Sequence, residues 1–179
     1  MQERYLFKSE RLGFRNWKSS DLAEMAEINA DSEVMKFFPN IQNSSETQNF
    51  IERMQKQFAD HGYCYFAVEL INDSTFIGFI GIADQTYKAD FTPCTDMGWR
   101  LNKKYWGKGY ATEGAKRCIE YAFQELGLDK IFSIAPKINA NSEAVITKIG
   151  MSKVKEFDHP LLLDDSRLKV CVLYEIENL

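Results

Sequence analysis

The sequence contains 179 residues, 45% of them hydrophobic and 27% charged, with a formal net charge of −4. A chain of this length buries enough surface to fold without metals or disulfides, so we expect a single domain over residues 1–179. The acidic balance excludes the broad basic surface that binds nucleic acids.

The cysteines and the N-terminal segment bear on metal sites and location. The four cysteines show neither metal-ligand spacing nor a Cys-x-x-Cys motif, so we expect reduced thiols and no metal site. Residues 1–10 lack the apolar run of a signal peptide, and no stretch approaches the ~18 apolar residues of a spanning helix. We therefore expect a cytoplasmic protein that neither enters a membrane nor contacts nucleic acid directly.

The first third of the chain is expected to contain one strand and two helices. Residues 12–17 alternate between apolar and polar side chains, which predicts a strand. An amphipathic pattern beginning near residue 20 predicts a first helix. Ser45 and Gln48 have the spacing of a capping box, which predicts the start of a second helix.

A hairpin and a strand–helix unit are expected in the centre of the chain. Two runs rich in aromatic and β-branched residues, 63–71 and 75–83, predict paired strands. A third strand at 95–101 leads through a turn into an amphipathic helix that ends at Gly127. The later elements are expected at 130–135 (strand), 142–149 (helix), near 154 (strand) and at 168–176 (strand). This order predicts a mixed α/β fold, with an antiparallel meander before a strand–helix–strand–helix unit.

The turn before the long helix has the composition of a phosphate-binding loop. Residues 106–112 read Trp-Gly-Lys-Gly-Tyr-Ala-Thr, and they lie where unpaired N–H groups and the helix dipole attract anions. Gly107 and Gly109 let the backbone approach a pyrophosphate closely. The segment is neither a dinucleotide fingerprint, because Thr112 stands where the third glycine belongs, nor a Walker motif. Glycines that merely form a turn are the alternative interpretation.

Segments spread over nearly the whole chain together resemble the GNAT acetyltransferase superfamily, and in particular its RimJ/RimL-like branch of ribosomal-protein N-terminal acetyltransferases. These segments are 11–15, 34–39, 78–81, 97–101, the glycine turn, Asn139-x-x-Ser142, 148–151 and His159-Pro160. Trp106 departs from the Gln or Arg of the commonest superfamily motif, although the Trp-Gly-x-Gly-Tyr-Ala form is similar to that of this branch.

The resemblance implies the GNAT acyl-CoA N-acyltransferase fold and acetyl-CoA as the cofactor. That fold has a central mixed sheet of about six or seven strands with about four helices, splayed between the fourth and fifth strands, here 95–101 and 130–135. Pantetheine would lie in the gap. The implied cofactor contacts are main-chain groups of Trp99, Arg100 and Leu101 for pantetheine and acetyl, the segment Gly107, Lys108, Gly109, Tyr110, Ala111 and Thr112 for the pyrophosphate, and Asn139 for the cofactor arm.

The resemblance also implies roles for two side chains. Asp96 lies where relatives often carry a glutamate general base, and Glu113 is the rival, although a carboxylate in the first turn of a helix is also explained by the dipole. Ser142 matches the serine placed to protonate the leaving thiolate, although serine is also an ordinary helix cap. His159 is interpreted either as part of the acceptor pocket or as a loop residue.

The activity implied is direct acetyl transfer to a primary amine, either a protein N-terminus or a small molecule, by a monomer or a homodimer. Main-chain N–H groups near residues 99–101 would stabilise the oxyanion. Two alternatives remain open: a non-catalytic coenzyme A-binding sensor or scaffold, and a binding protein for another nucleotide. The resemblance also implies an acceptor pocket that involves residues 34–51 and 157–167.

Overall fold

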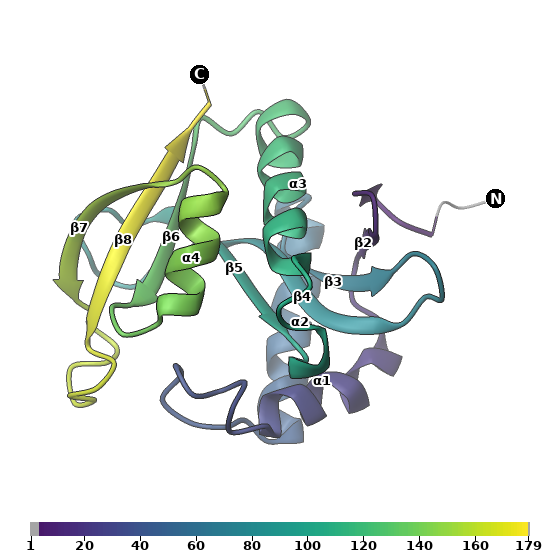
Figure 1. Cartoon of the computed structure of the whole chain (residues 1–179), viewed down its shortest axis with the longest axis horizontal. Coiled ribbons are helices and arrows are strands. Elements are labelled where there is room, and N and C mark those ends of the chain that lie inside the picture. Colours follow the sequence, from purple (N-terminus) through teal and green to yellow (C-terminus); the bar gives the residue numbers. More distant parts are fainter. Residues whose placement is uncertain (1–3, 179) are drawn as a thin grey trace.

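One mixed sheet runs through residues 4–178, which are the residues described by the computed structural model. Its strand order is β1-β2-β3-β4-β5-β6-β8-β7, and all neighbouring pairs are antiparallel except β5 and β6 (Figure 1). The strands are β1 (Phe7–Lys8), β2 (Leu12–Arg15), β3 (Tyr65–Leu70), β4 (Phe76–Gln85), β5 (Cys94–Leu101), β6 (Lys130–Pro136), β7 (Ser152–Asp158) and β8 (Val170–Glu177).

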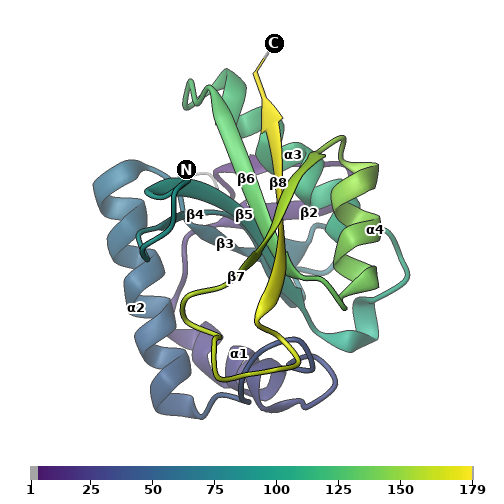
Figure 2. The same ribbon diagram turned by 90° about the vertical axis from the view of Figure 1, so that its left-hand side faces the viewer.

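Helices cover both faces of this sheet. Figure 1 shows α3 and α4 in front of the strands and α1 and α2 behind them, and the rotated view in Figure 2 agrees. The helices are α1 (Leu22–Ala30), α2 (Ser44–His61), α3 (Tyr110–Gln124) and α4 (Ala140–Lys148), with short 3₁₀ helices at Ser19–Asp21 and Lys103–Tyr105. Within residues 4–178, none of the helices has the length and apolar character needed to cross a bilayer.

The sheet opens between β5 and β6, as expected for strands near 95–101 and 130–135. β4 and β5 pair continuously from Gly78↔Leu101 to Gln85↔Cys94, whereas β5 and β6 pair only at Asp96↔Phe132. The expected mixed α/β architecture with a splayed sheet is therefore confirmed, but the sheet has eight strands instead of six or seven, so the gap follows the fifth strand rather than the fourth. The two-residue β1 is too short to show an alternating sequence pattern.

Helix α2 begins two residues earlier than its expected capping box. The Asn43 side chain accepts a hydrogen bond from the Glu46 N–H at 2.9 Å, and the Glu46 carboxylate accepts one from the Asn43 N–H at 2.8 Å. The prediction of a box at Ser45 and Gln48 is therefore wrong. Both pairs have the same spacing, but the carboxylate of Glu46 also gains from the positive end of the helix dipole.

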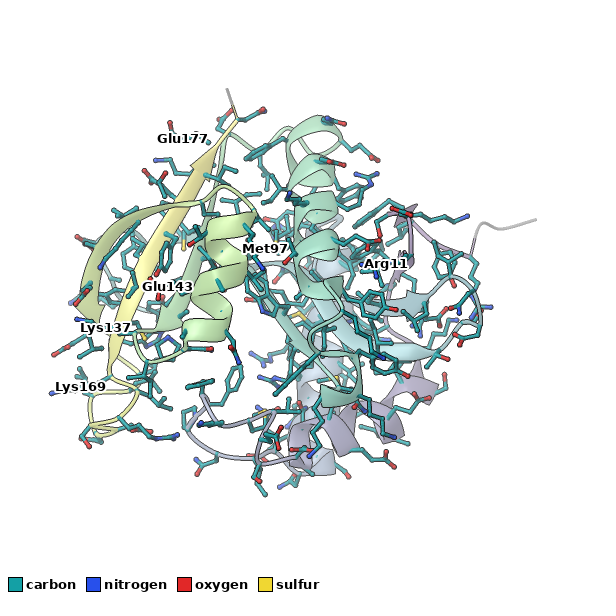
Figure 3. All side chains as sticks on the ribbon, viewed as in Figure 1. Arg11, Met97, Lys137, Glu143, Lys169 and Glu177 are labelled. Carbon is teal, nitrogen blue, oxygen red and sulfur yellow. The ribbon has the colours of Figure 1, made fainter. Side chains whose placement is uncertain are left out.

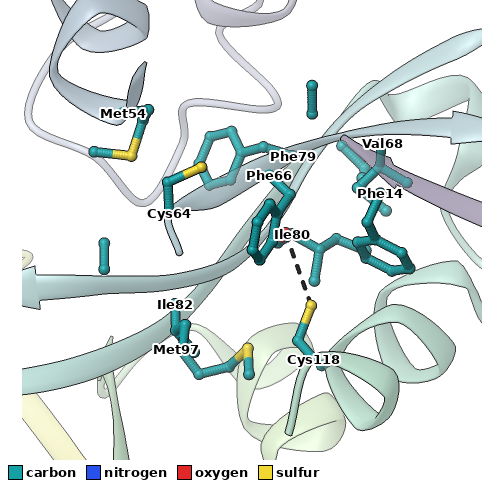
Figure 4. Packing of buried hydrophobic residues seen from close by; sticks show 14 of the residues in the cluster. Phe14, Met54, Cys64, Phe66, Val68, Phe79, Ile80, Ile82, Met97 and Cys118 are labelled. Atoms are coloured by element: carbon teal, nitrogen blue, oxygen red, sulfur yellow. Dashed lines mark hydrogen bonds between the residues drawn. The ribbon is translucent and has the colours of Figure 1, made fainter. Parts of the chain in front are cut away.

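Helix α3 packs closely on the sheet. Gly114 faces the core, and a Cβ there would lie only 2.4 Å from Cδ1 of Ile80. One turn later the buried Cys118 thiol lies 3.9 Å from the Ile80 carbonyl oxygen, in a cluster with Phe14 and Phe66 (Figure 4). These contacts hold α3 against β4. The cysteines are free thiols, as expected.

Candidate active site

A cavity of about 320 Å³ lies where β5 and β6 separate. It reaches both faces of the sheet, because its walls include residues from α4 on one side and from α2 and the loop before it on the other. Representative wall residues are Asn139 and Ser142 near α4, Asp96 and Ser133 in the centre, and Gln42, Phe50 and Arg53 toward α2. Two reactants that enter from opposite faces of the sheet can therefore meet inside it.

The edge of β5 that faces the gap carries main-chain groups without a strand partner. The Asn102 N–H donates to the Ile77 carbonyl at 2.9 Å, so the alternation of an antiparallel pair directs Arg100 main-chain groups toward Phe79 on β4. Those of Trp99 and Leu101 point the other way, into the gap. Arg100 thus offers the cavity its side chain rather than its main chain. Of the three expected main-chain contacts with pantetheine, the geometry leaves those of Trp99 and Leu101.

Two side-chain bonds mark the limits of this open edge. The Ser133 hydroxyl donates to the Met97 carbonyl at 3.0 Å, and the Trp106 indole N–H donates to the Leu101 carbonyl at 2.9 Å. Figure 3 shows Met97 in the space between α3 and α4. Between these bonds, the N–H and C=O of Trp99 and the N–H of Leu101 remain available to a bound molecule.

The glycine turn has the geometry of an anion site. Gly107 and Gly109 have φ angles of +71° and +83°, which only glycine adopts readily, and Gly109 is the N-cap of α3. The Glu113 N–H makes the first helical bond, to the Gly109 carbonyl at 3.0 Å, so the N–H groups just before it are not used by the helix. A Cβ added at Gly107 would meet no atom within 4 Å, so this face of the turn is open.

Glu113, the rival candidate for the base, is engaged elsewhere. Its carboxylate accepts hydrogen bonds from the Ser9 hydroxyl at 2.7 Å, the Arg11 N–H at 2.8 Å and the Arg11 Nε at 2.6 Å. Burial alone would raise the pKa of Glu113, but these bonds outweigh it and lower the pKa. Arg11 also lies over the Tyr110 ring at 4.4 Å, beside α3 (Figure 3). Glu113 therefore anchors the turn to the N-terminal strands.

Asp96 is a buried carboxylate at the point where β5 and β6 separate. Its Oδ2 accepts a hydrogen bond from the Tyr65 hydroxyl at 2.7 Å, and its Oδ1 accepts one from the Ile134 N–H at 3.1 Å. Burial raises the pKa of Asp96 to about 7, whereas burial and the nearby Asp96 charge keep the pKa of Tyr65 well above its ordinary value. Asp96 is therefore able to take up a proton near neutral pH, while Tyr65 stays protonated.

Tyr65 was not identified from the sequence, yet two glycines make room for it. Gly81 and Gly98 lie opposite Tyr65 on the next two strands, on the same face of the sheet. A Cβ on Gly98 would lie 3.0 Å from Cε1 of the tyrosine ring, and one on Gly81 would lie 2.8 Å from its Cα. Gly81 and Gly98 in the sequence indicate that a large side chain packs across these strands. Only the pairing register of β3, β4 and β5 shows that this side chain is Tyr65.

Asn139 and Ser142 lie on the α4 side of the cavity. Asn139 is the N-cap of α4, and its side-chain oxygen accepts a hydrogen bond from the Ser142 N–H at 3.1 Å. The capping role considered for Ser142 therefore belongs to Asn139. Ser142 lies in the first turn, half-buried, and lines the cavity.

His159 lies in the loop after β7 and does not line the cavity. Its ring packs at 4.5 Å from that of Tyr87, and its Nδ1 accepts a hydrogen bond from the Leu161 N–H at 3.2 Å. Burial lowers its pKa. This loop reaches the loop between α1 and α2 (Figure 2). There the Arg167 Nη1 donates to the Lys36 carbonyl.

Comparison with known proteins decides the family. The model of the acetyltransferase (GNAT) domain matches residues 11–152. The chain belongs to the GNAT acetyltransferase family. It is therefore an N-acetyltransferase, and acetyl-CoA is its acetyl donor.

Individual relatives agree with this family. The uncharacterized N-acetyltransferase YnaD of Bacillus subtilis (strain 168) is 30% identical over 146 residues, covering 81% of each chain. The putative ribosomal N-acetyltransferase YdaF of the same organism is 26% identical over 150 residues, 79% of this chain and 78% of YdaF, in keeping with the RimJ/RimL-like branch. A GNAT-family acetyltransferase structure from Bacillus anthracis superposes with a TM-score of 0.79 at 28% identity, covering 95% of this chain and 96% of that one.

Proposed function

We propose that this GNAT enzyme acetylates a primary amine by direct attack on acetyl-CoA, without an acetylated enzyme. The observation that carries the proposal is Asp96, a buried carboxylate with a pKa of about 7, at the one point where the open edge of β5 meets β6. A carboxylate whose pKa is raised to about 7 can take up a proton near neutral pH, which suits general base catalysis. The acceptor is either a protein N-terminus or a small amine.

The residues around the cavity fit acetyl-CoA. The turn, which is open at Gly107, leaves free N–H groups and the positive end of the α3 dipole for a pyrophosphate, with Lys108 and Thr112 beside them. The unpaired edge at Trp99 and Leu101 offers hydrogen-bond donors and an acceptor to an amide-containing arm. Asn139 would contact the arm from the α4 side. The thioester supplies an acetyl group that is already activated.

The protein's part in the reaction is to move two protons and stabilise one charge. Asp96 would accept the proton that the amine nitrogen loses as its bond to the acetyl carbon forms, with the Tyr65 hydroxyl as the link. A main-chain N–H on the open edge would stabilise the charge that develops on the carbonyl oxygen. As the carbon–sulfur bond breaks, the Ser142 hydroxyl would protonate the sulfur and then regain a proton from solvent.

The amine dependence of thiol release separates this proposal from a coenzyme A sensor. Acetyl-CoA is incubated with the protein and a panel of amines and N-terminal peptides, and thiol release is corrected for hydrolysis. We expect release with at least one amine and a product heavier by one acetyl group in mass spectrometry. Binding of acetyl-CoA with no amine-dependent release would favour the sensor instead.

The role of the glycine turn is tested by replacing Gly109 with valine. A β-branched residue is strained at a φ of +83° and obstructs the N–H groups, so we expect the Kd for acetyl-CoA to rise about tenfold or more. Calorimetry measures the Kd.

Gly127→Val is the matched control for this substitution. Gly127 has a φ of +67° at the other end of α3, so valine there costs similar backbone strain away from the turn. Its Kd for acetyl-CoA should stay near that of the unmodified protein. Equal affinities in the two variants would show that the turn does not hold the pyrophosphate.

A further inference from the structure

One buried cation in the cavity has no anionic partner. Arg100 is 8% exposed, and its Nη1 donates to the Asn29 side-chain oxygen at 2.6 Å and lies 3.4 Å from that of Gln42. Its Nε is buried without a hydrogen-bond partner, and no carboxylate among residues 4–178 pairs with it. Burial lowers the pKa of Arg100 to about 10, so the guanidinium is still charged at neutral pH.

The other buried arginine of the chain shows what such a group normally requires. Arg15, 4% exposed, is bonded to the Asp21 carboxylate through two nitrogens at 2.8 Å and to Glu69 at 2.7 Å. Arg100 has only neutral amide oxygens and the faces of two rings, Phe38 at 4.1 Å and Phe79 at 5.4 Å. Aromatic faces attract a cation but do not accept its N–H groups as a carboxylate does.

The Arg100 side chain lines the same face of the cavity as Asp96, the side on which the acceptor is proposed to bind. Phe38, Gln42, Phe79 and Arg100 all line the cavity. Asp96 and Arg100 are four residues apart on β5, so they lie on the same face of the sheet, toward α1 and α2, with their Cα atoms roughly 13 Å apart. The glycine turn begins α3 on the opposite face. A molecule bound along the α2 side therefore meets Asp96 at one end and Arg100 at the other.

We propose that the amine acceptor carries a carboxylate that binds the Arg100 guanidinium while its amino group faces Asp96 and Tyr65. This inference rests on the proposed function and specifies its substrate class. A planar guanidinium with unused N–H groups matches a carboxylate in geometry and charge. The exposed Arg53 on α2 adds a second cation to the same wall. A polyamine would instead bring another positive charge to this wall.

The carboxylate is either the α-carboxylate of a free amino acid or an acidic side chain at the start of a peptide. Two sets of matched acceptors distinguish these sources. The first set is a free amino acid, its α-amide and its decarboxylated amine. The second set is a pair of short peptides that begin with glutamate or glutamine. We expect kcat/KM to be about tenfold or more higher for the carboxylate-bearing member of one set. Equal kcat/KM values across both sets would overturn the inference.

Substitution of Arg100 tests whether this residue causes the preference. Arg100→Met should lower kcat/KM about tenfold or more for the carboxylate acceptor but less than about threefold for its amide. Arg100→Lys keeps the charge without the planar fork and should retain part of the preference. Arg117→Met is the control, because this half-buried arginine of α3 packs on Phe7 and does not line the cavity, and it should leave the preference intact. Thermal unfolding of each variant checks that it is folded.

A binding measurement separates the failure of this inference from failure of the proposed function. Calorimetry compares the carboxylate acceptor with its amide as ligands of the protein–coenzyme A complex. Carboxylate-dependent binding that Arg100→Met abolishes, without any turnover, would support the site and contradict the catalytic proposal. Turnover that falls equally for all acceptors in Arg100→Met would overturn the inference and leave the proposed function standing.

Discussion

Asp96→Asn is expected to lower kcat/KM at neutral pH by about 10²- to 10³-fold, with the Kd for acetyl-CoA changed less than about threefold. Asparagine cannot take up the proton from the amine. Its side-chain oxygen is still able to accept the Ile134 N–H that fastens β5 to β6, so the cavity should keep its shape. A variant with near-normal turnover would remove Asp96 from the mechanism.

The pH profile of the same variant provides an independent test. Because the base must be ionised, kcat/KM of the unmodified enzyme should rise as the pH increases through about 7. An acceptor amine with a low pKa keeps its own ionisation outside this range. The inflection should disappear in Asp96→Asn, and an inflection that persists would assign it to another group.

As the pH rises toward 7, the stability contributed by Asp96 should fall while kcat/KM rises. The pKa of Asp96 is raised by burial from 3.8 to about 7, so the folded state prefers the protonated carboxyl. This contribution is fully present below pH 4 and is lost as the pH rises to about 7. Asp96→Asn, which carries no charge, should thus be more stable than the unmodified protein above pH 7, by up to roughly 4 kcal/mol at about 1.36 kcal/mol per pKa unit. Denaturant unfolding at pH 4 and pH 8 measures this difference.

The second large effect is expected from Arg15→Met, which should lower the free energy of unfolding at pH 7.5 by about 3–5 kcal/mol. Arg15, Asp21 and Glu69 are each 4% exposed, and the guanidinium joins both carboxylates. Without Arg15 the two carboxylates remain buried and lose their shared counter-ion. Denaturant unfolding followed by circular dichroism measures the loss.

The pH dependence of this loss identifies its cause. Burial alone would raise the pKa of Glu69, but hydrogen bonds from Arg15 and Arg4 outweigh it and lower the pKa. Glu69 therefore stabilises the fold above its ordinary pKa of 4.5, and this contribution is lost as the pH falls. The difference between Arg15→Met and the unmodified protein should shrink below about pH 4. Lys56→Met, which breaks an exposed pair with Asp60, is the control and should cost less than about 1 kcal/mol.

The features that the sequence predicted depend on neighbouring residues. The turn at 106–112, the stripe of the following helix and the strands on either side of the gap are all local patterns. From these patterns we predicted the mixed α/β fold and the gap beside β5. The capping box at Asn43 was missed because the segment holds two pairs with the same spacing.

The features that were missed depend on contacts across strands. Tyr65 meets Asp96 only because β3, β4 and β5 pair in one register, and 31 residues separate the two side chains. The Arg100 side chain is buried against Asn29, which lies 71 residues away. Glu113 has a partner in Arg11, 102 residues earlier. Nothing within a short window of sequence indicates such pairs.

The alternation of side chains along β5 gives this enzyme two surfaces that can change separately. Trp99 and Leu101 offer main-chain atoms, which are the same whatever their side chains, to the gap. Arg100 points toward the wall formed by α2 and the loop before it. On the acceptor binding that we propose, substitutions in that wall would alter which amine is accepted and leave the turn at α3 untouched. Descendants of one ancestral gene can therefore diversify their acceptors while inheriting the same acetyl donor.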